Sequence, residues 1–254
     1  MIARAANAAG AAAGPHGGQP VVAAGRPAGE AAAAVILVHG RGATAESMLD
    51  LAAALERPDL AYLAPQAAAD TRYPRSWYPQ SFMAPLAANE PGLSSALGVL
   101  AGLVERLAAA GVPPARTVLL GFSQGACLAL ELAARQPRRY GGLIGFSGGL
   151  IGPPGTPRDG LGPAGAPGAD PPEGPLAGTP VFLGCSDRDP HVPKARVDET
   201  AEALARLGAR VTERIYPGMG HTVVADEIAV ARAMLALLAP DAGIDAGIDR
   251  PPAG

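Results

Sequence analysis

The sequence predicts an α/β fold in which helices cover both faces of a mostly parallel central sheet. Short apolar runs rich in β-branched residues alternate along the chain with longer helical segments, the pattern of strands joined by crossover helices. The clearest example is 118–126, VLLGFSQGA, in which a buried strand turns sharply at a glycine and leads into a helix. A hydrophobic content of 48% in 254 residues is enough for one sizeable core, built from Ala, Leu and Val because only 4% of the residues are aromatic.

The chain is predicted to form a single domain over residues 19–240. Residues 1–18 are rich in Ala and Gly without apolar periodicity, which indicates a flexible tail. A signal peptide is the competing interpretation of this segment, but Asn7 and Gly10 interrupt its apolar region. Residues 241–254, which repeat Asp-Ala-Gly-Ile, are predicted to be a second flexible tail.

Within the domain, strands and helices are expected to alternate. Strands are expected at 21–24, as a short antiparallel edge, and at 35–38, 60–64, 117–120, 142–146, 181–184 and 211–215. Helices are expected at 44–55, with Thr44 as N-cap, and at 93–110, 126–134, 194–207 and 223–238. Residues 152–178 are so rich in Pro and Gly that we expect an irregular surface excursion there.

The longest informative loop is 65–91. A loop of this length in a compact domain usually binds or covers something. Its apolar side chains Trp77, Tyr78, Phe82 and Met83 are predicted to form a wall that receives part of a substrate. The alternative, which is compatible with this one, is that they pack the loop onto the sheet.

Residues 121–125, Gly-Phe-Ser-Gln-Gly, match the G-x-S-x-G pattern of a nucleophilic serine at a strand-to-helix turn. Glycine is needed on both sides because a Cβ would strike the neighbouring strand or helix at so tight a turn. The turn exposes the serine hydroxyl, and the following helix directs its unpaired N–H groups at the reacting atom. The alternative, a glycine-rich turn that contains serine by chance, is disfavoured by the flanking strand and helix. Ser123 is therefore the predicted nucleophile.

A serine hydroxyl becomes a good nucleophile only when a histidine, oriented by a carboxylate, takes its proton. Of the four histidines, only His191 and His221 follow Ser123, as the chain order Ser, acid, His requires. His221 lies in a glycine-rich loop between an expected strand and an expected helix, at the edge of the sheet where such a base belongs. We predict His221 as the base, against the alternative of a surface histidine, and interpret His191 as a loop or pocket-rim residue.

Two acids compete for the third position, in the loop that follows the strand at 181–184. Asp189 precedes Pro190, which holds it in an extended conformation and interrupts the chain before the next helix. Asp187 suits a turn-forming or capping role. We therefore favour Asp189 as the acid.

The oxyanion hole requires two N–H donors. The residue after the nucleophile, Gln124, supplies one of them, and a loop after an early strand supplies the other. The strand at 35–38 leads into His-Gly-Arg-Gly, whose glycines let the backbone turn its amides inward, so the N–H of Arg41 is the second predicted donor. His39 precedes the serine and is interpreted as a structural residue that holds this loop.

Composition excludes several classes of function. The net charge of −3 and the lack of a basic run predict no nucleic-acid partner. No run approaches the roughly 18 apolar residues of a transmembrane helix, so stable membrane insertion is not expected. Cys127 and Cys185 are interpreted as small buried residues in a reducing, cytoplasmic compartment, and neither has metal-ligand spacing. No metal or cofactor is predicted.

The motifs together resemble those of a known family. HGRGATAESM, SWYPQSFMAPLAANEPGLSSAL, GFSQGA, DPHVP and YPGMGH follow one another, between about residues 31 and 238, in the order of the phospholipase/carboxylesterase family of α/β-hydrolases, which includes the acyl-protein thioesterases. The resemblance implies the α/β-hydrolase fold, a triad of Ser123, Asp189 and His221, and oxyanion donors at Arg41 and Gln124. The arginine of HGRG and segment 89–92 are closer to bacterial carboxylesterases than to the thioesterases, whose loop usually reads HGLGD.

The expected function is that of a serine carboxylesterase acting on small to medium carboxylic esters or thioesters through an acyl-enzyme. Two alternatives remain open. One is a non-catalytic binder of small molecules whose triad is a remnant, and the other is an acyltransferase that uses the same triad. The predicted partner is a small-molecule ester, and a homodimer contact through an exposed apolar face of the 65–91 loop is left open.

Overall fold

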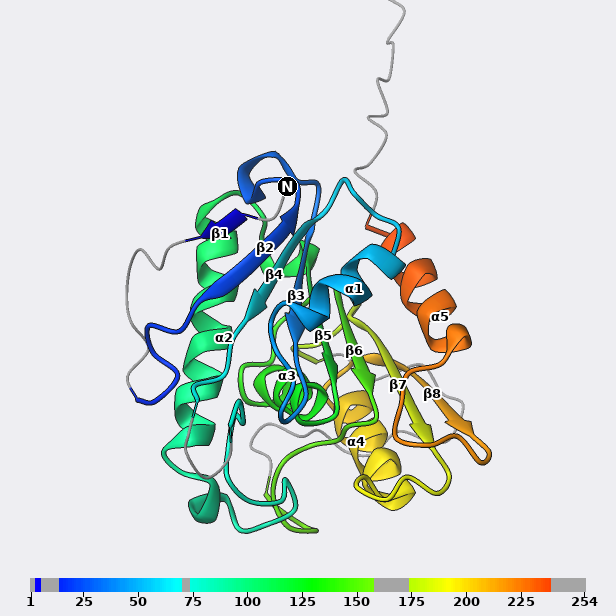
Figure 1. Cartoon of the computed structure of the whole chain (residues 1–254). Helices are drawn as coiled ribbons and strands as arrows, with labels where there is room; N and C mark the ends of the chain where they lie inside the picture. The colour runs from blue at the N-terminus through cyan, green and yellow to red at the C-terminus, as the bar shows by residue number, and fades with distance from the viewer. Residues whose placement is uncertain (1–2, 6–13, 70–73, 158–173, 239–254) are drawn as a thin grey trace, which may run out of the picture.

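The computed structural model describes residues 3–5, 14–69, 74–157 and 174–238, and these residues build one eight-stranded sheet flanked by helices (Figure 1). The spatial order of the strands is β1-β2-β4-β3-β5-β6-β7-β8. From β4 to β8 in this order the neighbouring strands are parallel, whereas β2 is antiparallel to both β4 and β1. The strands are β1 (Ala3–Ala5), β2 (Val21–Gly25), β3 (Ala34–Val38), β4 (Ala61–Pro65), β5 (Thr117–Phe122), β6 (Gly142–Phe146), β7 (Pro180–Ser186) and β8 (Arg210–Tyr216).

Helices cover both faces of the sheet. On one face α1 and α5 pack against the strands, and on the other face α2, α3 and α4 do so (Figure 1). The helices are α1 (Ser47–Ala54), α2 (Gly92–Ala109), α3 (Gln124–Arg135), α4 (Lys194–Arg206) and α5 (Ala225–Ala236), with short 3₁₀ turns at Ala28–Glu30, Leu86–Asn89 and Pro114–Arg116. This arrangement confirms the predicted α/β class and α/β-hydrolase architecture.

The central strands are apolar throughout because both of their faces are covered. Every residue of β3 is buried. Ile36 and Val38 contribute to the core beneath α2, α3 and α4, while Val35 and Leu37 contribute to the core beneath α1 and α5. β8, at the end of the sheet, instead alternates exposed and half-buried residues. The period-2 alternation of side chains thus places one strand in two cores.

The segment predicted as a flexible tail, 1–18, is partly ordered, which corrects the prediction. Ala3–Ala5 pair with β2, so β2 is not an edge strand. His16 is buried, donates from Nε2 to the carbonyl oxygen of Trp77 at 2.7 Å and accepts at Nδ1 from the Ala68 N–H at 3.0 Å. These long-range bonds attach His16 to the domain, and a sequence without apolar periodicity gives no sign of them. Residues 1–2 and 6–13 and the predicted tail 241–254 lie outside the described residues.

The predicted excursion 152–178 is described only at its two ends, since 158–173 lie outside the described residues. At the second end Leu176 is fully buried and its N–H donates to the carbonyl oxygen of Leu207 at 2.9 Å. This end is therefore attached to the domain through the residue that follows α4.

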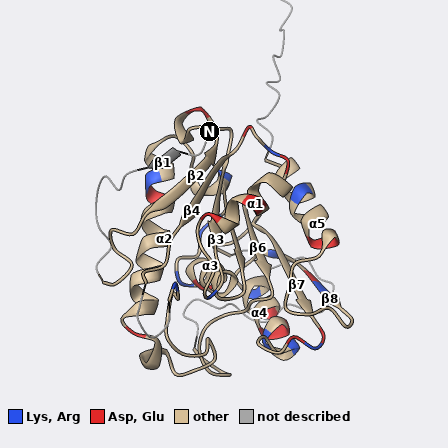
Figure 2. Ribbon diagram, in the orientation of Figure 1, with Lys and Arg blue, Asp and Glu red and all other residues tan. Residues whose placement is uncertain are grey.

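By length and composition alone, α2 could cross a membrane, because its 18 residues have a mean hydropathy of 1.3. Its apolar residues form one side that packs on the sheet, and the buried ones are Leu93, Ala96, Leu97, Leu100, Leu103, Val104 and Leu107. That pattern is typical of a core helix. Charged residues of both signs are interspersed over the molecule, without a single-sign stripe in the view of Figure 2.

Candidate active site

Ser123 lies between the last residue of β5 and the first residue of α3. Its backbone has φ 54° and ψ −120°, a conformation that residues other than glycine rarely adopt. The Ser123 N–H donates to the carbonyl oxygen of Phe146 on β6 at 2.9 Å, which ties the strained residue to the neighbouring strand. The turn therefore holds the serine at the carboxyl edge of the sheet.

The glycines around the serine are required by close backbone contacts. A Cβ on Gly121 would overlap the backbone of Gly125, and a Cβ on Gly125 would overlap the carbonyl group of Val38 on β3. A Cβ on Gly40, in the loop after β3, would lie 3.3 Å from the Ser123 Cβ. The β3 loop and the serine turn thus approach each other more closely than side chains allow.

His221 and Asp189 continue from Ser123 as a chain of hydrogen bonds. His221, in the loop between β8 and α5, has Nε2 2.8 Å from Ser123 Oγ and Nδ1 2.7 Å from Asp189 Oδ2. Because an ionised carboxylate only accepts, Nδ1 carries the imidazole proton and Nε2 is left to accept from the serine hydroxyl. The structure therefore brings together the three side chains that the sequence analysis nominated.

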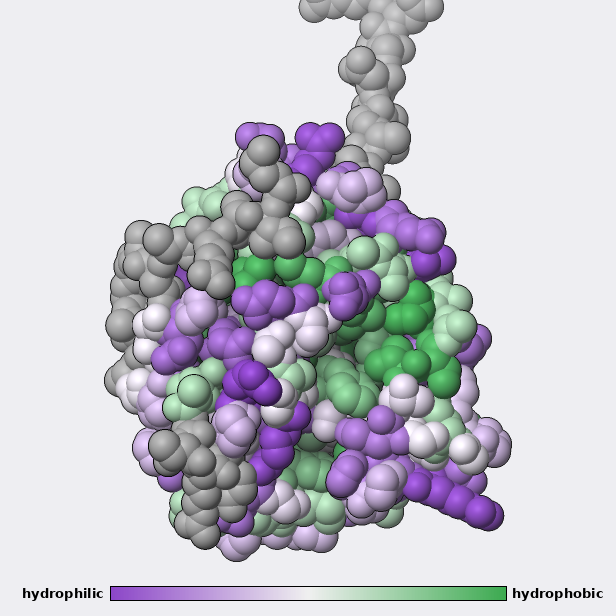
Figure 3. Space-filling view, in the orientation of Figure 1, coloured by the Kyte–Doolittle hydropathy of each residue, from purple (hydrophilic) through white to green (hydrophobic). Residues whose placement is uncertain are grey.

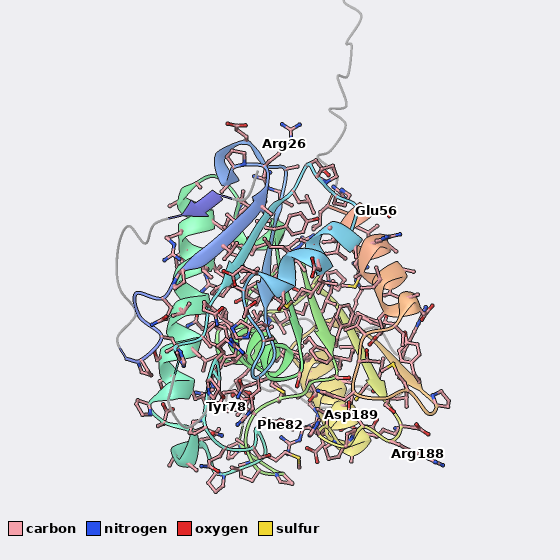
Figure 4. The ribbon with its side chains drawn as sticks, viewed as in Figure 1. Arg26, Glu56, Tyr78, Phe82, Arg188 and Asp189 are labelled. Carbon is pink, nitrogen blue, oxygen red and sulfur yellow. The ribbon has the colours of Figure 1, made fainter. Side chains whose placement is uncertain are left out.

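The environment of Asp189 favours its ionised form. Burial on its own raises the pKa of this carboxyl group, but the His221 hydrogen bond lowers it, as do the backbone N–H groups of His191 and Val192, which donate to Oδ1 at 2.8 and 2.9 Å. The net result is a pKa below the ordinary aspartate value. Figure 4 shows Asp189 in the loop below β7, with its neighbour Arg188 directed outward.

Asp187, the competing acid, makes a different contact. Its Oδ1 accepts the backbone N–H of Gly218 at 2.8 Å, so it fixes the loop that carries His221 without touching the imidazole. Its own N–H donates to the Tyr216 carbonyl oxygen at 3.3 Å. This position fits the turn-forming role that the sequence indicated for Asp187.

His191 packs edge-on against His221, with ring centroids 4.8 Å apart. It also lines the cavity in front of Ser123. Both observations agree with the interpretation of His191 as a pocket-rim residue.

His39 supports the loop that follows β3. It is buried, its Nδ1 donates to the Gly40 carbonyl oxygen at 2.7 Å, and its Nε2 accepts the Ala67 N–H at 3.1 Å. Burial lowers its pKa, which keeps the ring neutral. These contacts agree with a structural role for His39.

The two predicted oxyanion donors, Arg41 and Gln124, both line the cavity beside Ser123. Gln124 is the first residue of α3, where backbone N–H groups have no intrahelical partner. The use of these two amides as oxyanion donors stays a prediction. Their side chains make contacts that the sequence analysis did not foresee: the Gln124 amide accepts the Trp77 N–H at 2.9 Å and donates to the Tyr78 carbonyl oxygen at 2.9 Å.

The cavity has a volume of about 580 Å³, within the range of small-molecule sites. The residues that line the cavity are Gly40, Arg41, Ala43, Tyr78, Pro79, Gln80, Ser81, Phe82, Phe122, Ser123, Gln124, Cys127, His191, Val192 and His221.

Away from the cavity, hydrophobic side chains reach the surface beside α5 on the face shown in Figure 3.

The four loop residues predicted as a substrate wall separate into two pairs. Tyr78 and Phe82, which are labelled in Figure 4, line the cavity, whereas Trp77 and Met83 do not. Trp77 is fully buried and its Nε1 donates to the His39 carbonyl oxygen at 2.9 Å, and Met83 packs against the core. Tyr78 and Phe82 also belong to the core, so the packing of the loop onto the sheet is seen for all four residues, and contact of Tyr78 and Phe82 with a substrate stays a prediction.

Both cysteines are buried, as expected. Cys127 lines the cavity, and burial raises the pKa of its thiol to about 12, so it is not a rival nucleophile. Cys185 Sγ lies 3.9 Å from Asp189 Oδ2. Within the described part of the chain, no three His, Cys, Asp or Glu residues gather where they could hold a metal ion.

Glu227, in the first turn of α5, is a buried acid that sequence reasoning missed. Its Oε2 accepts the Val224 N–H at 2.8 Å, and a Cβ on Gly184 would overlap its Oε1. Among the described residues, Oε1 has no hydrogen-bond partner. The sequence feature connected with this buried acid is Gly184, whose lack of a side chain leaves room for the Glu227 carboxyl group.

Burial raises the pKa of Glu227 to about 7 from an ordinary value of 4.5; the Val224 bond lowers it and Asp226 raises it further. Between these two values the unfolded chain is ionised while the folded chain stays protonated, so stability falls as pH rises through this window. Glu227→Gln removes this loss. We expect its melting temperature relative to wild type to increase between pH 4.5 and pH 8, measured by thermal unfolding. A constant difference across this range would contradict the assignment.

Most of the chain is similar to a known family and to solved structures. A model described as phospholipase/carboxylesterase matches residues 19–239. The solved phospholipase/carboxylesterase from Dyadobacter fermentans DSM 18053 is 37% identical, with a TM-score of 0.74, over 89% of this chain and 99% of its own. The solved esterase PE8 is 28% identical, with a TM-score of 0.66, over 85% of this chain and 97% of its own.

Curated sequence relatives match over a shorter region. Acyl-protein thioesterase 1 of Gibberella zeae is 34% identical over 133 residues, which are 52% of this chain and 52% of the relative. The thioesterase of the same name from Saccharomyces cerevisiae is 28% identical over 54% of this chain and 56% of its own. The chain thus spans about half the length of the curated relatives it matches.

Proposed function

The chain belongs to the phospholipase/carboxylesterase family of α/β-hydrolases, and from this membership and its site we propose that it is a serine hydrolase of carboxylic esters. The observation that carries the proposal is the unbroken set of hydrogen bonds from Ser123 Oγ through His221 to Asp189. That set gives a serine hydroxyl, an imidazole and a carboxyl group in the order that nucleophilic catalysis needs.

In the proposed mechanism, Ser123 Oγ attacks the ester carbonyl carbon while His221 Nε2 takes the hydroxyl proton. Asp189 accepts from Nδ1–H and stabilises the imidazolium. The carbonyl oxygen becomes negative and accepts hydrogen bonds from the N–H groups of Arg41 and Gln124. When the tetrahedral intermediate collapses, Nε2 returns the proton to the departing alcohol. A water molecule then attacks the acyl-enzyme with the same help from His221 and releases the acid.

The lining and the volume of the cavity favour a neutral substrate of small to medium size. Its side chains include Phe122, Phe82, Tyr78 and Val192, and its volume of about 580 Å³ suits a compact acyl or aryl group. Thioesters are a second candidate substrate, since curated relatives are named acyl-protein thioesterases. An ester and a thioester of the same acyl group would pass through the same acyl-enzyme.

The test is hydrolysis of p-nitrophenyl esters from acetate to palmitate, with the matched acyl thioesters assayed in parallel. We expect turnover of the esters with a maximum at one chain length, set by the depth of the cavity. Hydrolysis of thioesters alone would overturn the ester assignment. Ligand affinity without turnover in either series would favour the non-catalytic alternative, and ester products formed from added alcohols in preference to acids would favour an acyltransferase.

A further inference from the structure

One side of the cavity is a single irregular stretch of chain, residues 78–82, which we term the pocket wall. All five of its residues line the cavity. None belongs to a helix or strand, so its shape depends on bonds made to its backbone from elsewhere. The residues that make these bonds therefore influence the shape of the cavity.

Three consecutive carbonyl groups of the pocket wall accept hydrogen bonds from one side chain, Arg41. Its Nη1 donates to Pro79 at 2.9 Å, and its Nη2 donates to Tyr78 at 3.2 Å and to Gln80 at 2.7 Å. A guanidinium group can do this because its five N–H donors lie in one rigid plane. An ammonium group has no such fork.

The same arginine belongs to the reaction centre through its backbone. Arg41 follows Gly40, which packs against the serine turn, and its N–H is one of the two proposed oxyanion donors. Trp77, immediately before the wall, is bonded to the same loop through the His39 carbonyl oxygen. The loop after β3 is thus bonded both to the pocket wall and to the residue that precedes it.

The far end of the wall is held by a different residue. Asn89 accepts the Gln80 N–H at 2.9 Å and donates to the Ser81 carbonyl oxygen at 2.9 Å. The Phe82 carbonyl oxygen accepts the Gly152 N–H at 2.7 Å. At the near end, the Tyr78 carbonyl oxygen also accepts from Ser76 Oγ at 2.7 Å and from the Gln124 amide at 2.9 Å, whereas the Pro79 carbonyl group is held by Arg41.

We propose that Arg41 is a positioning residue that determines acyl specificity: its guanidinium group holds the pocket wall against the catalytic loop and so sets the acyl size that the cavity accepts. This inference rests on the proposed esterase function. Without the Arg41 hydrogen bonds, the pocket wall moves away from an acyl group that contacts it. Substrates whose acyl group contacts the wall then lose their alignment with Ser123. Misplacement by about 1 Å can lower a rate on the order of 100-fold.

The experiment compares Arg41→Met, Arg41→Lys and wild type over the p-nitrophenyl ester series. The matched control is Arg116→Met, since Arg116 is also exposed and also bonds carbonyl groups, those of Ala32 and Gly111, at the opposite end of β5. For Arg41→Met we expect kcat/KM to fall most for the preferred ester, by about 10- to 100-fold, with a smaller loss for acetate. Chain-length preference therefore flattens, and the loss falls more on kcat than on KM because the bound ester is misaligned with Ser123. Lysine does not restore the preference, and Arg116→Met keeps the wild-type profile.

A second readout needs no turnover. Trp77 is the only tryptophan in the chain, it is fully buried, and it adjoins the wall, so its quenching by acrylamide reports on the wall directly. We expect stronger quenching in Arg41→Met than in wild type and Arg116→Met. Equal quenching would overturn the proposal, and so would an equal loss of kcat/KM across the ester series. Absence of turnover in wild type would instead overturn the esterase function.

Discussion

Replacement of Ser123 by alanine is expected to lower kcat for the preferred ester by about 10⁶-fold. The variant keeps the cavity and the histidine but lacks the oxygen that forms the acyl-enzyme. Steady-state hydrolysis of the preferred p-nitrophenyl ester measures the loss. Removal of the Ser123 hydroxyl also leaves His221 Nε2 without the donor that lies 2.8 Å away.

A fold control accompanies this measurement. Ser123 occupies a strained backbone position, and alanine must adopt the same φ of 54°. Thermal unfolding of both proteins therefore separates loss of chemistry from loss of structure. A correctly folded alanine variant that retains most of the wild-type turnover would show that another group is the nucleophile.

The second large effect is expected from Asp189→Asn. An asparagine side chain offers an amide N–H where the carboxylate accepts, so it stabilises the wrong imidazole tautomer and no longer supports the imidazolium; kcat should fall by about 10⁴-fold. The side chain of Asp189 has no exposed surface and its Oδ2 lies 2.7 Å from His221 Nδ1, so water does not easily take over as the acceptor for Nδ1–H. The pH profile of kcat/KM, measured beside kcat, checks that the loss does not simply reflect a shifted titration.

Asp187→Asn is the matched control for this substitution. Asparagine keeps an oxygen that can accept the Gly218 N–H, and a typical hydrogen bond contributes only about 1 kcal/mol. Since about 1.4 kcal/mol corresponds to tenfold in rate, we expect kcat within about tenfold of wild type. Equal, large losses in both variants would leave the acid unassigned, and a larger loss in Asp187→Asn would reverse the assignment.

Much of the site could be predicted from the sequence because its signals are local. The serine turn requires glycine at 121 and 125 for reasons of backbone contact alone, and Gly125 indeed lies against the Val38 carbonyl group. The choice of Asp189 over Asp187 rested on a neighbouring proline, and the two side chains do point to different partners. Parallel strands then bring these loops to one edge of the sheet.

What the sequence did not reveal depends on contacts between distant residues. His16 lies in an Ala- and Gly-rich stretch without periodicity, yet it bonds to Trp77 and Ala68. The contacts of the Arg41 side chain could not be predicted from the sequence either, although the HGRG motif predicted a role for the backbone N–H of Arg41. Composition and spacing describe neighbours along the chain, whereas hydrogen bonds across 37 to 61 residues need the folded structure.

Whether Ser123 is the nucleophile of a serine esterase is tested most simply by locating the adduct of a fluorophosphonate on the wild-type chain. After labelling, digestion and mass spectrometry of the peptides identify the modified residue. We expect one stoichiometric adduct on Ser123, with loss of ester turnover in proportion to labelling. An adduct on another residue that abolishes turnover, or full turnover with no adduct at all, would contradict the assignment of Ser123 as the nucleophile.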